Sequence, residues 1–171
     1  MSSAFTFAVA SGIEPDGLWV YGDMAYNHGT MCSPRMYREL VWPDHRRLGA
    51  WAEAHGLPLI YHTDGDVNAV IELYLEAGIT CLQPLEAKAG MDVGVLGPRY
   101  GERMSFLGNI NQAVIGTNDV DRIDAEVRAK LAAGKAHRGY GYHSDHSVPP
   151  TVSLASYRRV IELLDEFGNY D

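Results

Sequence analysis

The residues best suited to chemistry are a histidine and an aspartate at the end of an apolar segment. The stretch Pro58–Val67 reads PLIYHTDGDV, and its first half has the composition of a buried strand. Residues two apart share one face of a strand, so His62 and Asp64 are expected to address the same point. Gly65 permits a sharp turn after them, and Asp66 is suited to cap the helix that follows.

Together with His146, these two side chains form the predicted catalytic group, and three kinds of site are open to it. Two imidazoles and a carboxylate suit Zn²⁺, Fe²⁺ or Mn²⁺, and a bound ion would hold a thiol or alkoxide as its anion. Without a metal, His62 and Asp64 within hydrogen-bond reach would serve as a general acid and base. The third alternative is a hydrogen-bonded network that only orients loops.

The segments that must position these residues alternate between predicted strands and helices. The predicted strands are 17–22, 57–61, 79–85, 104–108 and 139–143. The predicted helices are 34–41, 44–55, 67–77, 92–100, 117–133 and 153–167, and residues 24–32 are a predicted loop. Ser33 and Ser153 are expected helix caps, and Thr117 or Asn118 a third. This alternation predicts the α/β class with a parallel sheet.

Polar residues follow the end of every predicted strand. Parallel strands finish on one edge of a sheet or barrel, so these side chains are expected to line one pocket. The predicted substrate-binding residues are Asp23, Tyr26, Glu86, Asn109, Asn111, His143 and Asp145.

Several of these residues have a plainer interpretation. Asp23 either reaches the pocket floor or caps a turn, and for Glu86 a solvated loop carboxylate is the favoured reading. Asn109 and Asn111 either donate to a substrate or satisfy backbone groups in their turn. Cys81 lies in an apolar segment and is expected to be a packing residue.

Composition narrows the range of partners. The net charge of −8 comes without a basic stripe, which argues against nucleic acid or an anionic membrane and leaves a small-molecule substrate. The two cysteines form no C-x-x-C motif, so a reduced, cytoplasmic protein is expected. The first twelve residues have neither the basic start nor the apolar length of a signal peptide or membrane span.

Five strands do not close a (βα)8 barrel. The chain is therefore either an open five-stranded sheet or part of a larger barrel. A complete flavodoxin-like domain would normally carry a phosphate-binding loop after its first strand, and GDMAYNHG is a poor candidate for one.

The spacing of the segments resembles the C-terminal half of the uroporphyrinogen decarboxylase superfamily, from Gly17 to Phe167. That superfamily holds the decarboxylases of a tetrapyrrole substrate in porphyrin biosynthesis and the zinc-dependent corrinoid or coenzyme M methyltransferases. The matching stretches are DGLWVYGDMA, MCSPRMYRELVWP, LIYHTDGDV, ITCLQPLE, MSFLGNIN and GYGYHSDHSVPP.

The resemblance implies about five βα units from the C-terminal part of a TIM-type (βα)8 barrel. Residues 1–171 would form one domain that lacks the first strands of the barrel. It further implies either a homo-oligomer or pairing with the missing N-terminal half, and a non-catalytic half-barrel is one alternative. The resemblance implies a lyase or a methyltransferase activity for the family, with inactivity of this chain alone as a further expectation.

Roles transfer only at matching positions. In the methyltransferase branch His62 matches the histidine of an H-x-C zinc motif, whereas Asp64 and His146 stand where the cysteine ligands would be. A corrinoid would then be a methyl donor. In the decarboxylase branch His146 matches a substrate-contacting histidine of a G-H-G-x-x-P-like turn, and Tyr26 lies near a loop that carries a substrate-contacting tyrosine.

Overall fold

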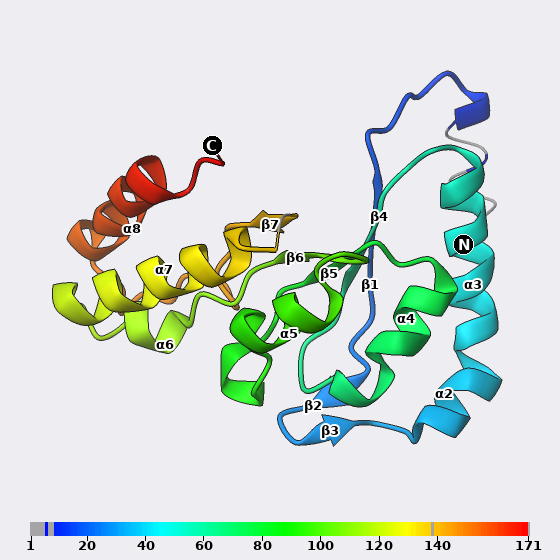
Figure 1. The fold of residues 1–171 in the computed structure, drawn as a ribbon, viewed down its shortest axis with the longest axis horizontal. Helices are drawn as coiled ribbons and strands as arrows, with labels where there is room; N and C mark the ends of the chain where they lie inside the picture. The colour runs from blue at the N-terminus through cyan, green and yellow to red at the C-terminus, as the bar shows by residue number, and fades with distance from the viewer. Residues whose placement is uncertain (1–5, 7–8, 138, 171) are drawn as a thin grey trace. The chain divides into compact units, whose positions relative to one another are not determined.

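The computed structural model describes residue 6, residues 9–137 and residues 139–170, and it divides the chain into two compact units. Unit 1 spans residues 1–82 and unit 2 spans residues 83–171. Each unit is described by itself below, with the element labels of Figure 1.

Unit 1 is built on the parallel pair β1 (Leu18–Tyr21) and β4 (Leu59–His62), which run side by side in Figure 1. Their register sets Leu18 beside Leu59 and Tyr21 beside His62. Leu18, Leu59 and Tyr61 are buried, and the Tyr61 ring packs against His45 and Tyr74 of two helices. The other face carries side chains of intermediate or high exposure, so the strands alternate as their sequence predicts.

Three helices accompany this pair in unit 1. They are α2 (Pro34–Leu40), α3 (Trp42–Ala54) and α4 (Ile71–Ala77). The Ser33 side chain accepts a hydrogen bond from the Met36 N–H, which confirms the predicted cap. Pro43 lies in the first turn of α3, where proline costs no hydrogen bond.

Two predictions for unit 1 were wrong in detail. The expected loop at 24–32 contains a hairpin of β2 (Ala25–Tyr26) and β3 (Gly29–Thr30), too short for an alternating pattern to show. The helix expected from Val67 begins as a 3-10 turn, η1 (Asn68–Val70), and becomes α4 only at Ile71. Asp66 accepts from the Asn68 N–H, so it closes a local turn before the helix.

Unit 2 continues the alternation of strand and helix. Strand β5 (Cys81–Gln83) crosses the boundary between the units along the chain. It is followed by η2 (Ala87–Ala89), α5 (Val93–Tyr100), β6 (Ser105–Leu107), α6 (Gln112–Ile115), α7 (Val120–Lys135), β7 (Tyr140–Gly141) and α8 (Leu154–Phe167). Strands β6 and β7 pair in parallel, and α7 packs on α8.

Of the two helix caps predicted in unit 2, one is confirmed and one is wrong. Ser153 caps α8 as predicted, through the Ser156 N–H. The cap of α7 is Asp119, which accepts from Asp121 and Arg122, and neither Thr117 nor Asn118 fills that role. Asn118 lies instead at a positive φ of 58°, a conformation that asparagine tolerates well.

The α/β class is confirmed. The five strands follow one another in the order β1, β4, β5, β6, β7, and the pairs β1–β4 and β6–β7 are parallel. Burial raises the pKa of the Cys81 thiol to about 12, consistent with the packing role predicted for it. Among the described helices, none is both long enough and apolar enough to cross a membrane.

Replacing Gly49 by alanine tests the close contact of α3 with α4. A Cβ at position 49 would lie 1.9 Å from the carbonyl oxygen of Ala77. Glycine to alanine inside a helix ordinarily adds about 1 kcal/mol of stability. We expect Gly49→Ala instead to lower the free energy of unfolding by about 2 kcal/mol, because backbone atoms of the two helices must separate. Urea unfolding measures the change, and a gain in stability would contradict the contact.

Candidate functional site

The loops that follow β1 and β4 carry a polar cluster in unit 1. The two strands end level with each other because Tyr21 is in register with His62, and the Gly22 N–H donates to the His62 carbonyl at 3.0 Å. Asp23 therefore leaves β1 where Asp64 leaves β4. The N–H of Asp64 donates to Oδ1 of Asp23 at 3.0 Å and closes the cluster.

The three side chains of this cluster are placed to share one ligand. His62 Nε2 lies 3.8 Å from Asp23 Oδ1, and one donor atom from each of Asp23, His62 and Asp64 lies within 4.8 Å of the other two. With metal–ligand bonds of about 2.0–2.2 Å, neighbouring donors would lie about 3.4 Å apart, so the three side chains would have to move closer around an ion. The Asp23 side chain is 51% exposed, so its carboxylate is accessible from solvent.

Aromatic side chains border the cluster. The Tyr21 ring meets the His62 ring edge to face at 6.4 Å between centroids, and Tyr21 is 84% exposed. Tyr26, a predicted substrate contact, is also exposed, and its carbonyl accepts from the Asp66 N–H at 2.8 Å. Gly65 makes this approach possible: its φ is +87°, and a Cβ there would lie 2.5 Å from the Ala25 carbonyl carbon.

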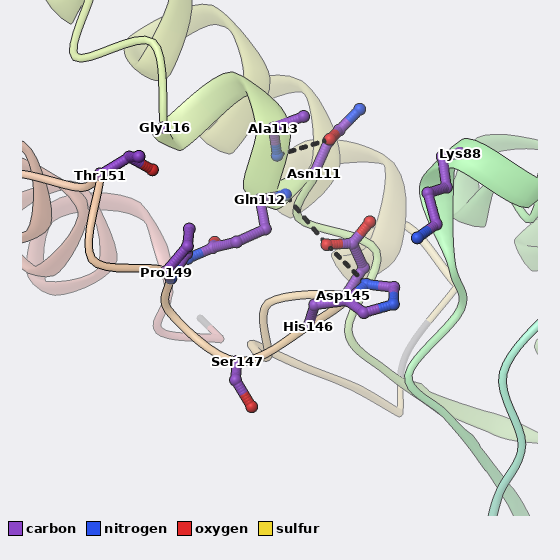
Figure 2. A pocket seen from close by; sticks show the side chains of 10 residues that line it. All are labelled: Lys88, Asn111, Gln112, Ala113, Gly116, Asp145, His146, Ser147, Pro149 and Thr151. Carbon is purple, nitrogen blue, oxygen red and sulfur yellow. Dashed lines mark hydrogen bonds and ion pairs between the residues drawn. The ribbon is translucent and has the colours of Figure 1, made fainter.

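A second cluster in unit 2 surrounds His146. Nε2 of His146 lies 3.8 Å from Glu86 Oε1, and Nδ1 lies 3.5 Å from Asp145 Oδ1. The imidazole is thus within reach of two carboxylates, and Lys88 Nζ lies 3.1 Å from the same Glu86 oxygen. Figure 2 shows His146 and Asp145 together, with Lys88 on one side and Gln112 on the other. The arrangement suits a proton donor or a hydrogen-bonding contact to a ligand.

The burial of Glu86 differs from the sequence prediction. The sequence favours a solvated loop carboxylate at this position, whereas Glu86 is only 3% exposed. Its charge is tolerated because the Lys88 ammonium contacts it and His146 lies near. The spacing E-A-K offered a signal, since a lysine two residues on can fold back over a short turn.

Asp145 is similarly buried and fully engaged. Its Oδ1 accepts from the Gln112 N–H at 2.9 Å and its Oδ2 from the Ala87 N–H at 3.2 Å. The carboxylate therefore ties the loop after β7 to the start of α6 and to η2. Its Oδ1 also lies 3.5 Å from His146 Nδ1, so the carboxylate is placed to orient that imidazole, and Asp145 lines the neighbouring cavity as well.

A cavity of about 380 Å³ opens beside this cluster (Figure 2). It is lined by Lys88, Asn111, Gln112, Ala113, Gly116, Asp145, His146, Ser147, Pro149 and Thr151. Gln112 was not predicted, and its buried Nε2 has no hydrogen-bond partner among the described residues. The only sequence signal for a role of Gln112 at the cavity was its place directly after the GNIN turn.

The remaining predicted residues divide between structure and cavity. Asn109 is fully buried, and its side chain contacts the backbone of Val93, Leu85 and Met91, so its amide serves the turn. Asn111 caps α6 through the Ala113 N–H and lines the cavity. The His143 ring is 3.4 Å from the Gln83 amide.

The predicted residues thus fall into two groups. Asp23, His62 and Asp64 meet in unit 1, and Glu86, Asp145 and His146 meet in unit 2. A common site for His62, Asp64 and His146 stays a prediction, because these residues belong to different units.

Comparison with known proteins places this arrangement in context. The family described as Uroporphyrinogen decarboxylase (URO-D) matches residues 19–167. A solved methyltransferase from Methanosarcina mazei is similar in fold, with a TM-score of 0.69 at 22% identity. The match covers 94% of this chain and 44% of that one, so the chain spans less than half of the methyltransferase's length. The prediction of a partial (βα)8 barrel is confirmed. No curated protein matches the chain.

Lys88→Met tests how the buried Glu86 charge is compensated. The variant removes the ammonium that lies 3.1 Å from a carboxylate with a 4% exposed side chain. We expect the free energy of unfolding at pH 7 to fall by about 1–2 kcal/mol, discounted for the exposed lysine. The double variant Lys88→Met/Glu86→Gln should recover most of the loss, measured by urea unfolding. Equal stability of Lys88→Met and the native chain would contradict this pairing.

Proposed function

Since the chain belongs to the uroporphyrinogen decarboxylase family, we propose that it forms part of a barrel enzyme of the methyltransferase branch. In this proposal Asp23, His62 and Asp64 bind a divalent metal ion, and the enzyme moves a methyl group from a corrinoid or methoxylated compound to a thiol or hydroxyl. The observation that carries it is the three donors within 4.8 Å of one another in unit 1.

The donor set suits the proposed ion. One imidazole and two carboxylates favour Zn²⁺, Mn²⁺ or Fe²⁺ over ions that need thiolates. When bound, such an ion lowers the pKa of a coordinated thiol or hydroxyl and so supplies a nucleophile near neutral pH. The match of His62 to the histidine of the family's H-x-C motif supports the same position, with Asp64 in place of the cysteine.

The protein's own contribution is binding and proton transfer. Methyl transfer forms a bond from sulfur or oxygen to the methyl carbon and breaks the bond from that carbon to its donor. The nucleophile must also lose a proton. Asp23 Oδ1 lies 3.8 Å from His62 Nε2 and would share the ion with it, so the second oxygen of this carboxylate would accept that proton.

The proposal also requires barrel strands in addition to those of this chain. Trp19 is 53% exposed and Tyr21 is 84% exposed, and by strand alternation both lie on the face of β1 opposite the buried Leu18. In a closed barrel this face would be internal. We infer that additional strands cover it, from another chain or from further sequence, as the 44% coverage of the methyltransferase also suggests.

Metal uptake tests the proposal. We expect one Zn²⁺ or Mn²⁺ per chain after dialysis, measured by elemental analysis and by calorimetric titration. His62→Ala should weaken affinity at least tenfold, because one of three ligands is lost. His55→Ala is the matched control, since His55 is an exposed helix-end histidine that contacts the Trp51 carbonyl. Metal-free native protein, or equal affinity in His62→Ala, would reject this function.

A second function is supported by the cluster around His146. In a decarboxylation, the bond from carbon to the carboxylate breaks, its electron pair stays on that carbon, CO₂ leaves, and the carbon takes up a proton. His146 lies beside the 380 Å³ cavity and within 4 Å of two carboxylates, which suits it to donate that proton.

The decarboxylase alternative predicts a different variant response. CO₂ release from uroporphyrinogen should then fall at least a hundredfold in His146→Gln, because a general acid is lost. His55→Gln serves as the control, because His55 is an exposed histidine at the end of α3 that contacts the Trp51 carbonyl. A chelator should leave this activity intact, whereas methyl transfer should stop. Unchanged CO₂ release in His146→Gln would exclude His146 as the donor.

A further inference from the structure

We propose that Tyr61 and Thr63 are positioning residues that aim the Asp23 carboxylate at the metal site of unit 1. This inference rests on the proposed metal binding by Asp23, His62 and Asp64. It assigns a role to the two residues of YHTD that the ligand set leaves unused.

The alternation of a strand separates the two roles. Tyr61 is 3% exposed and Thr63 is 2% exposed, whereas His62 and Asp64 are of intermediate burial. Residues two apart share a face, so one pair turns toward the helices and the other toward the cluster with Asp23. Four consecutive residues thus hold both the ligands and their support.

Tyr61 and Thr63 hydrogen-bond to the backbone of the loop after β1, one on each side of Asp23. The Tyr61 hydroxyl donates to the Gly22 carbonyl at 2.6 Å. The Met24 N–H donates to Thr63 Oγ1 at 3.0 Å. Because the residues before and after Asp23 are both fixed to β4, little beyond the aspartate side-chain torsions stays adjustable, and the carboxylate is held near His62 before any ion arrives.

Tyr61 is itself held firmly. Its ring packs edge to face against His45, with centroids 4.8 Å apart, and against Tyr74 at 5.2 Å. Burial, together with the nearby charge of Asp23, raises the pKa of the Tyr61 phenol well above its usual value. The hydroxyl is therefore protonated near neutral pH, where it donates to the Gly22 carbonyl.

The same aromatic cluster supplies a matched control. Tyr37 is fully buried, its ring lies 5.5 Å from that of Tyr74, and its hydroxyl contacts His45 Nδ1 at 2.7 Å. Tyr37→Phe removes one buried hydroxyl from the same surroundings, as Tyr61→Phe does. Only the latter releases the Gly22 carbonyl.

The experiment compares the two variants with Zn²⁺ and with Co²⁺. We expect Tyr61→Phe to weaken Zn²⁺ affinity about tenfold and to alter the visible absorption of bound Co²⁺, because Asp23 is no longer aimed. Tyr37→Phe should keep the native affinity within twofold and the native Co²⁺ spectrum. Circular dichroism and urea unfolding compare the folding of both.

Thr63 gives a second, independent pair of variants. Thr63→Ser keeps the oxygen that accepts from Met24 and should preserve affinity, whereas Thr63→Val should weaken it about tenfold. Native affinity and an unchanged Co²⁺ spectrum in both Tyr61→Phe and Thr63→Val would overturn the positioning role while metal binding stands. If the native chain binds neither ion, the proposed metal function and the positioning role fail together.

Discussion

The parallel pairing of β1 with β4 is the constraint on which the candidate metal site depends. The register that sets Tyr21 beside His62 brings both strand ends to the same level, so that Asp23 and Asp64 leave the sheet together. A slip of one residue would turn His62 toward the helices and Tyr61 toward the cluster. Burial of Leu59 and Tyr61 opposes that slip, because it would expose both side chains.

In unit 2 the loop that carries His146 is fixed by the Asp145 carboxylate, whereas in unit 1 strand register fixes the site loops. Strand β7 has only two residues, too few to fix the loop that follows it. Asp145 accepts from two backbone N–H groups, on η2 and α6, and so anchors this loop next to His146. Hydrogen bonds to an ionised acceptor are stronger than neutral ones, which suits a single residue to hold three segments.

The sequence predicted the features that follow from regular backbone geometry. It missed the features that depend on contacts between individual side chains. Alternation of strand and helix gave the α/β class, and the i, i+2 spacing placed His62 with Asp64, because both follow from backbone geometry. Burial of Glu86 was not predicted, since it depends on contacts with Lys88 and His146 of which the E-A-K spacing signals only the first. The Gln112 position was missed because α6 has only four residues and shows no periodicity.

The two clusters differ in the exposure of their acids, and this difference bears on which of them could admit an ion. Asp23 has half of its side-chain surface open, and a metal ligand needs such access for the ion and a substrate. Glu86 and Asp145 are buried and already hold Lys88 or backbone N–H groups, so an ion would have to displace those partners. Asp145 Oδ1 also lies 3.5 Å from His146 Nδ1, so this carboxylate helps to hold the imidazole beside the cavity.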